Sequence, residues 1–273
     1  MSSVARRKNL VVLRAGDQSL HPGWLAGPGA RDFDILVSYY GKTEGLHRDT
    51  ADLWEHRPGP KWSCIGELLA ARPELLDHYE HFWFPDDDLA ADTLTVNRLF
   101  ALFQGFGLKL AQPALTRDSY RSWPQLLQRE HSVLRRVAFV EVMAPLFTRE
   151  SLRQCLPSFA ESRSGWGLDW VWPQVLGGHQ DGLIGVIDAV AVKHTRPVGG
   201  ELYKNNPELD PRRDSAALVA RYGIGDQRAL SKFVCVGWVA ERSLPLWERA
   251  WLHLKGWNAV RRARRRLRQG RAV

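Results

Sequence analysis

Residues 64–89 read CIGELLAARPELLDHYEHFWFPDDDL, and this stretch decides the fold class. Apolar residues recur at helical spacing as far as residue 79, and the aromatic run at 82–84 then indicates a buried strand. The strand stops at Pro85, and three aspartates, Asp86, Asp87 and Asp88, follow at once. Adjacent carboxylates repel one another, so a solvated turn is the simplest explanation for them. The alternative is a site that uses their charge.

Strands and helices alternate along most of the chain, which favours an α/β domain with a mixed, mostly parallel sheet flanked by helices. In such sheets ligands bind at the carboxyl ends of the strands, where the three aspartates stand. Carboxylates there are well placed to hold a hard cation such as Mg²⁺ or Mn²⁺, which prefers oxygen ligands. The other predicted strands are 9–15, 33–41, 110–115, 137–147 and 183–195, and the other predicted helices are 92–107 and 147–159.

The composition is that of a folded domain with a sizeable core, since 44% of the 273 residues are hydrophobic and 25% are charged. Its three cysteines form no CxxC pair, which argues against a disulfide framework and a thiolate zinc site and fits a reducing compartment. No segment approaches the roughly 18 consecutive apolar residues of a membrane span. We therefore expect a cytoplasmic protein.

The net charge of +8 is concentrated at the C-terminus, where the segment from Lys255 onward holds eight basic residues and no acidic one. Residues 1–243 are predicted to form one domain and 244–273 a separate, arginine-rich segment. Its first part carries an apolar helical face next to the basic residues, the composition of a helix that lies in a membrane interface. Peripheral attachment to the inner face of an anionic membrane is one hypothesis, and a helix packed on the domain is the other. The apolar face consists of Trp247, Ala250, Trp251 and Leu254.

Eight segments occur in the order DILVSYYG, KW at Lys61 and Trp62, PDDDL, NRLF, LAQPALT, FVEVMAP, SGWGLDW and IDAVAVKHTRPV. Together they resemble the signature of an uncharacterised family of plants and bacteria that is labelled lysine-ketoglutarate reductase trans-splicing related. The resemblance covers about residues 9–200. The label itself implies no chemistry that these residues support.

The same residues look like the working parts of a GT-A nucleotide-sugar glycosyltransferase. That resemblance implies a GT-A-like (Rossmann-like) sheet in which one strand ends in a DxD motif that holds a divalent ion against the donor's diphosphate. It implies that Asp88 and Asp86 serve the metal, Mn²⁺ or Mg²⁺, and that His194 completes its site. The segment GWGLDW at 165–170 is similar to the acceptor-side motif of that fold and makes Asp169 the candidate catalytic base.

The remaining candidates follow from the resemblance and from position. Asp169 is followed by Trp170 and not by a second acid, so a base and an anchor for an acceptor hydroxyl both stay open, with Glu141 as the next candidate base. The alternative role of the tryptophans is packing in the core. The alternative for His194 is that of a hydrogen-bonded polar residue with no part in the site. Donor-binding candidates are Asp86, Asp87, Lys193, Arg196, Ser19 and His21, and acceptor-binding candidates are Trp166, Trp170, Glu141 and Met143.

The predicted function is a metal-dependent transfer of sugar from a nucleotide-sugar donor to a hydroxyl of a glycan or lipid-linked acceptor. A divalent ion stabilises the departing diphosphate as a Lewis acid, and a carboxylate base contributes about 10²- to 10⁴-fold. Acidic clusters at strand ends also serve Mg²⁺-dependent phosphohydrolases and phosphotransferases, which the GWGLDW segment disfavours. Nucleic-acid binding through the arginine tail is a third hypothesis, disfavoured because no recognition motif accompanies the arginines.

Overall fold

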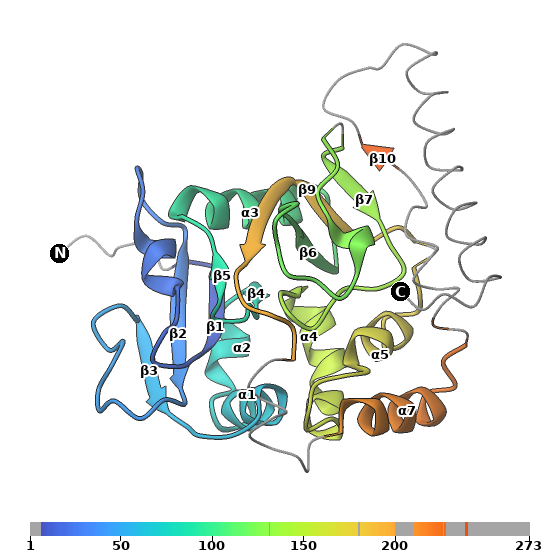
Figure 1. The fold of residues 1–273 in the computed structure, drawn as a ribbon, viewed down its shortest axis with the longest axis horizontal. Coiled ribbons are helices and arrows are strands. Elements are labelled where there is room, and N and C mark those ends of the chain that lie inside the picture. Colours follow the sequence, from blue (N-terminus) through green and yellow to red (C-terminus); the bar gives the residue numbers. More distant parts are fainter. Residues whose placement is uncertain are drawn as a thin grey trace.

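The computed structural model describes residues 7–130, 132–179, 181–199, 210–225, 227 and 238–239. Its main sheet has the strand order β10-β7-β9-β6-β8-β4-β1-β2-β3, and β5 pairs with β9 off this path (Figure 1). The strands are β1 (Asn9–Ala15), β2 (Phe33–Tyr39), β3 (Leu53–His56), β4 (His81–Trp83), β5 (Leu89–Ala90), β6 (Leu110–Leu115), β7 (Leu134–Arg136), β8 (Leu146–Thr148), β9 (Ile184–His194) and β10 (Trp238–Val239).

Strand direction defines two edges of this sheet. β1 to β4 run parallel, as do β6 and β9, whereas β8 runs antiparallel between β4 and β6. The carboxyl ends of β1 to β4, β6 and β9 therefore share one edge, the carboxyl edge, and their starts share the opposite amino edge. The predicted α/β domain, with a mixed, mostly parallel sheet flanked by helices, is confirmed.

Helices cover both faces of the sheet. Alternate residues of β4 and its continuation show this, because Trp83 packs on Trp24 of η1 on one face and Phe84 packs on Trp62 of α1 on the other. Figure 1 shows α3 on one side of the strands and α1, α4, α5 and α7 gathered on the other. The helices are α1 (Lys61–Ala71), α2 (Glu74–His78), α3 (Thr93–Gly105), α4 (Arg149–Cys155), α5 (Leu168–Val175) and α7 (Pro211–Arg221), with 3-10 turns η1 (His21–Leu25), η2 (Pro124–Leu126) and η3 (Leu156–Glu161).

Two predicted elements are corrected by the structure. The helix predicted over 64–79 is two helices, α1 and α2, because Pro73 cannot continue the first one. The strand predicted over 137–147 is wrong for most of its length. Only its end belongs to β8. The preceding chain starts beside the first residue of β9, where the Val137 amide donates to Ile184 O at 3.0 Å, and passes β6, where the Glu141 amide donates to the Gln112 side chain at 2.7 Å. Its apolar residues are buried as irregular chain.

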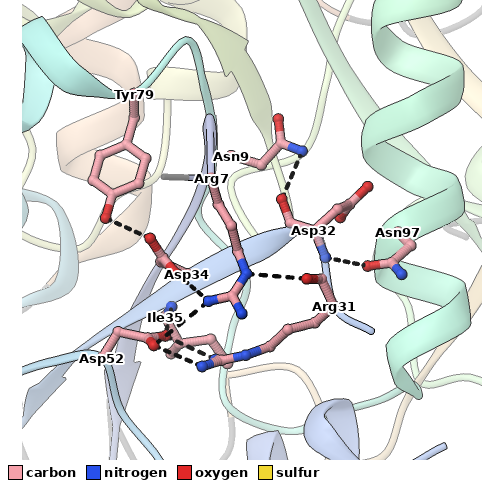
Figure 2. A network of polar contacts seen from close by, with 9 residues as sticks. All are labelled: Arg7, Asn9, Arg31, Asp32, Asp34, Ile35, Asp52, Tyr79 and Asn97. Atoms are coloured by element: carbon pink, nitrogen blue, oxygen red, sulfur yellow. Dashed lines mark hydrogen bonds and ion pairs between the residues drawn. The ribbon is translucent and has the colours of Figure 1, made fainter. Parts of the chain in front are cut away.

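The amino edge is closed by a network of ion pairs (Figure 2). Asp34 accepts from Arg7 at 2.6 Å and from the Tyr79 hydroxyl at 2.9 Å, so both of its oxygens have a donor. Arg31 binds both oxygens of Asp52 at 2.6 and 2.7 Å, and the Ile35 amide donates to the same carboxylate at 2.8 Å. These contacts fasten the starts of β1, β2 and β3 to one another.

The predicted C-terminal helix and the domain boundary at 243/244 lie outside the described residues, so both stay predictions. Among the residues that the structure does describe, no helix is long and apolar enough to cross a membrane. Cys64 and Cys155 are buried and form no disulfide.

Candidate functional site

The three aspartates lie at the carboxyl edge, directly after β4. Beyond the end of that strand, the Phe84 amide donates to Pro145 O at 2.9 Å and the Asp86 amide to Met143 O at 2.7 Å. These bonds hold the aspartates against the chain that leads into β8. The three carboxylates then find three different surroundings, which separates charges that would otherwise repel.

Asp87 joins the loop after β1 to the end of β9. Its carboxylate accepts from the Gly16 amide at 2.8 Å and from Arg196 at 3.1 Å, while its carbonyl accepts from the Leu20 amide at 2.7 Å. The Tyr40 hydroxyl lies 3.4 Å from the same carboxylate. Burial raises the pKa of Asp87, and the Gly16 amide and the Arg196 charge oppose that rise. The predicted donor residues Asp87 and Arg196 therefore lie together.

Asp88 faces His194, as the metal hypothesis requires. β5 pairs with β9 so that Leu89 lies opposite His194, and Nε2 of that ring is 3.1 Å from Asp88 Oδ2. The other carboxylate oxygen, Oδ1, is buried without a hydrogen-bond partner. On the far side of the ring, Nδ1 lies 2.8 Å from Tyr120 O, so Nδ1 carries a proton and Nε2 is the atom presented to Asp88.

The charge state of His194 follows from these contacts. Burial lowers its pKa, but the hydrogen bond and charge of Asp88, with the Tyr120 carbonyl, outweigh burial and raise the pKa to about 8. At neutral pH the ring is therefore mostly an imidazolium ion that neutralises Asp88.

Asp86 is turned toward Lys61. The ammonium group of Lys61 lies 2.7 Å from Asp86 Oδ1 and also donates to Phe84 O at 2.9 Å and Val142 O at 3.2 Å. The Asp86 side chain is 39% exposed, whereas that of Lys61 is 17% exposed. Of the predicted metal ligands, Asp88 and His194 are in contact and Asp86 is paired elsewhere. Among the described residues, no three His, Cys, Asp or Glu side chains form a ready metal-binding group.

Two buried acids complete the carboxyl edge. Glu141 and Asp169 are each 7% exposed, and each has one carboxylate oxygen without a partner. Burial raises the pKa of Asp169 to about 7, although hydrogen bonds from the backbone N–H groups of Trp170, Asp169 and Gly167 lower it. Burial and the nearby charge of Asp169 raise the pKa of Glu141 to about 8. A base of pKa near 7 is suited to take a proton at neutral pH.

The predicted acceptor residues have different surroundings. Trp170 is 6% exposed and stacks on Phe139 with centroids 4.8 Å apart, so its ring belongs to an aromatic cluster of the core. Trp166 is 39% exposed. Met143 is 5% exposed, and its carbonyl receives the Asp86 amide.

Three other candidates bond to residues away from the aspartates. Lys193 is exposed, pairs with Asp118 at 2.6 Å and precedes His194 on β9, so the two side chains point to opposite faces. Ser19 Oγ lies 2.8 Å from His21 Nδ1, and His21 Nε2 lies 2.9 Å from Thr50 Oγ1. Burial, with the charge of His47, lowers the pKa of His21 to about 4. These contacts give the buried His21 ring a role in holding its loop.

Sequence reasoning missed residues that support the site from outside it. Lys61 was noticed only as part of a motif, although its ammonium joins Asp86 to the chain before β8. The backbone carbonyl of Tyr120 orients the His194 ring, and the side-chain oxygen of Gln112 accepts a hydrogen bond from the backbone amide of Glu141. Pro60 before α1 signals a helix start, but no local pattern shows where the Lys61 side chain will reach.

The family model described as a protein of unknown function, DUF707, matches residues 61–222. The chain belongs to this family. The match begins later and ends later than the expected 9–200, and no comparison supports the reductase label. It contains Lys61, the three aspartates, both buried acids, His194 and Arg196, but not Ser19 or His21. No curated protein matches the chain.

Several solved structures resemble this DUF707 protein at low identity. Staphylococcus aureus TarS has 12% identity and a TM-score of 0.49, over 81% of this chain and 44% of that one, so the chain spans less than half of TarS. A mycobacterial protein has 20% identity and a TM-score of 0.49, over 81% and 77%. Glucosyl-3-phosphoglycerate synthase of Mycobacterium tuberculosis, solved with Mn²⁺, UDP and phosphoglyceric acid, has 18% and 0.45, over 82% and 81%. Likenesses with TM-scores below 0.5 carry no information on the activity of this chain.

Proposed function

We propose that this protein transfers a sugar from a nucleotide-sugar donor to a hydroxyl acceptor, with a divalent cation bound at Asp88. One observation carries the proposal: a buried Asp88 oxygen without a partner lies beside His194, at the sheet edge that also holds two buried acids of raised pKa. Unpartnered buried carboxylate oxygens are costly in a protein that has no ligand for them. Their gathering at one edge supports a binding and catalytic role.

The chemistry of these residues fits a hard cation such as Mn²⁺ or Mg²⁺. Asp88 supplies a carboxylate oxygen, and His194 supplies Nε2 once its proton has left, with Tyr120 O fixing the ring. Asp86 is within reach of solvent, and it joins the site if its contact with Lys61 is broken. When bound, the cation supplies Lewis-acid stabilisation of the leaving diphosphate.

The chain's own residues divide the remaining work. Arg196 lies beside Asp87 and brings positive charge for a diphosphate to the aspartate cluster. Asp169 holds the acceptor's proton, because its pKa of about 7 lets the carboxylate both exist and accept a proton at neutral pH. Glu141, with a pKa of about 8, is mostly protonated at pH 7 and donates a hydrogen bond to a substrate oxygen. Burial of both acids limits the access of water, so hydrolysis of the donor is slow beside transfer.

The acceptor class is proposed on the sequence alone, as a glycan or a lipid-linked hydroxyl. If the acceptor is lipid-linked, residues 244–273 attach the protein to an anionic membrane. Flotation on anionic and on neutral vesicles tests it, and removal of 255–273 is the control. Equal binding to anionic and neutral vesicles, or binding that persists after removal of 255–273, contradicts membrane attachment through this segment.

A thermal-shift panel tests the function. Purified protein is heated with UDP, GDP, TDP, CMP and their common sugar conjugates, each with and without Mn²⁺, because a ligand of the native state raises Tm by mass action. We expect stabilisation by one nucleotide class that needs Mn²⁺, followed by release of nucleotide diphosphate from its sugar conjugate. Asp88→Asn should abolish the metal-dependent shift, while Asp118→Asn, a carboxylate paired with Lys193, should keep it.

Two results would overturn the proposal. Stabilisation by nucleotides that is the same with and without Mn²⁺, and in Asp88→Asn, removes the metal site. Phosphate release from simple phosphate esters, without turnover of any nucleotide sugar, favours the phosphohydrolase alternative.

A further inference from the structure

Helix α7 lies against the loop formed by residues 162–167, which leads into α5 and Asp169. Hydrogen bonds to one carboxylate oxygen of Asp214, in the first turn of α7, join the loop to the helix. The Ser164 amide donates to Asp214 Oδ2 at 2.8 Å and the Ser164 hydroxyl donates to it at 2.7 Å. The fully buried Ser162 hydroxyl lies 3.4 Å from the same oxygen and 3.0 Å from Trp166 O. The loop is thus tied to the helix at both its start and its middle.

The helix and the loop approach so closely that only glycine fits at position 167. Gly167 has φ of +95°, and a Cβ there would stand 2.9 Å from Ser215 Cα and 3.0 Å from Leu218 Cδ1. Leu218 is 2% exposed, so its side chain is packed under the loop. The same surface continues through Tyr222, whose hydroxyl donates to Glu161 at 3.1 Å. α7 therefore contacts the backbone of the loop and not just its side chains.

The contact reaches Asp169 through backbone groups. Gly167 is the residue before α5 and occupies its N-terminal boundary. Its N–H, with those of Asp169 and Trp170, stabilises the Asp169 carboxylate. Gly167 O in turn accepts the Trp170 and Val171 amides at 3.1 Å. A shift of the loop on α7 must move the groups that hold the carboxylate.

We propose that α7 is a clamp on the 162–167 loop and that Asp214 is the positioning residue that keeps Asp169 aligned with the acceptor hydroxyl. The catalytic part of this inference rests on the proposed function. The clamp does not depend on that function, because the contacts between α7 and the loop order the loop whatever the protein binds. Asp214 is not the cap of its own helix, since the N-terminal cap of α7 is Asp210, which accepts the Arg212 and Arg213 amides at 3.0 and 3.2 Å.

Hydrogen exchange measured by mass spectrometry tests the clamp without any ligand. In Asp214→Ala the Ser164 amide loses its acceptor, and we expect peptides over 162–170 to exchange about tenfold faster or more. Asp214→Asn should be intermediate, because its amide oxygen still accepts. The matched control is Asp210→Asn, which removes the same charge from the same helix while asparagine still caps it. Unchanged exchange over 162–170 in Asp214→Ala, with the fold intact, overturns the clamp.

Turnover tests the positioning role. The assay follows release of nucleotide diphosphate, with water as acceptor, from the nucleotide sugar that stabilises the protein most. We expect Asp214→Ala to lower kcat about 10- to 100-fold with unchanged donor affinity, the size of effect that a misplaced catalytic group produces. In an Asp169→Asn background the same change should cost nothing further, because it acts through that carboxylate. An additive loss in that background, or wild-type turnover despite a loosened loop, overturns the positioning role.

The two measurements separate this inference from the proposed function. If no nucleotide sugar is turned over by the wild-type protein, the proposed function fails and the positioning role fails with it. The exchange result still decides whether α7 holds the loop.

Discussion

The two edges of the sheet treat carboxylates in opposite ways. At the amino edge (Figure 2), both oxygens of Asp34 and both of Asp52 have donors, most of them from Arg7 and Arg31. At the carboxyl edge, Asp88, Glu141 and Asp169 each keep one buried oxygen without a donor. Asp34 and Asp52 at the amino edge thus have donors for both oxygens, whereas Asp88, Glu141 and Asp169 at the carboxyl edge do not.

This difference separates carboxylates that join strands from carboxylates that gather at the candidate site. Burial disfavours the charged form of a carboxylate, so it raises the pKa of Glu141 and of Asp169, although backbone N–H groups oppose the rise at Asp169. The comparison makes predictions that differ in sign between the two edges.

Asp169→Asn should have the largest effect. We expect sugar transfer to fall by about 10²- to 10⁴-fold, because an amide cannot take the acceptor's proton. Donor affinity should stay near that of the wild type, since a base acts in the transition state. Steady-state rates and calorimetry with the donor check this, and Asp34→Asn at the amino edge is the control. Joint loss of binding and turnover would make Asp169 part of the donor site, and retained turnover would move the base to Glu141.

Asp88→Asn should come next. It removes one charge and one hard ligand with almost no change of volume, and we expect Mn²⁺ affinity to fall by about 100-fold or more. Asp52→Asn changes charge equally at the amino edge and should leave Mn²⁺ affinity alone. Titration calorimetry of the folded variants measures both. Equal Mn²⁺ binding by wild type and Asp88→Asn contradicts the metal assignment.

Metal affinity should depend on pH through His194. The raised pKa of about 8 means that the ring is protonated below that pH, and a cation must displace its proton. Mn²⁺ affinity should therefore rise by up to about tenfold per pH unit up to pH 8 and level off above it. Measurements at pH 6, 7, 8 and 9 check this, with His194→Gln expected to flatten the profile. An unchanged profile in that variant would mean that another group titrates.

Stability should respond with opposite signs at the two edges, although the effect is the smallest. A carboxyl whose folded-state pKa is raised contributes stability at low pH, and that contribution is lost as the pH rises toward the folded-state pKa. Asp169→Asn should thus raise Tm at pH 8 by a few degrees and change it little below pH 4, near the ordinary pKa of 3.8. Asp34→Ala should lower stability by about 1–3 kcal/mol, because it leaves Arg7 and Tyr79 without their acceptor. Melting curves that move in the same direction for both at pH 8 would break the comparison.

The sequence predicted the long strands of the sheet because their signals are local, but it did not predict the short strands β3, β5, β7 and β10. Asn9–Ala15, Leu110–Leu115 and Ile184–His194 are buried apolar runs that became strands within one residue of their predicted bounds. Asp92 and Thr148 cap their helices through the Thr95 and Ser151 amides. These features need no knowledge of distant residues.

The parts that escaped prediction depend on contacts far apart in the chain. Nothing near Glu141 indicates that its segment would be buried as irregular chain, since its amide pairs with a side chain on β6. The separate surroundings of the three aspartates were equally hidden, because they come from Gly16, Lys61 and His194. Trp170 looked like an acceptor platform beside Asp169, but its stacking on Phe139 depends on the chain before β8.

The tie between Asp87 and Arg196 has a consequence for the order of assembly during synthesis. Asp86 meets Lys61, 25 residues earlier in the chain, so that pair can form early, whereas Asp87 waits for a partner 109 residues later. Distant contacts close late because the chain must first lose the entropy of the intervening loop. A nascent chain that has reached only β6 holds the aspartates but neither His194 nor Arg196. The candidate site can therefore form only after β9 has left the ribosome. A pause in translation before β9 is made leaves the β6 edge unpaired and the aspartates without His194 and Arg196.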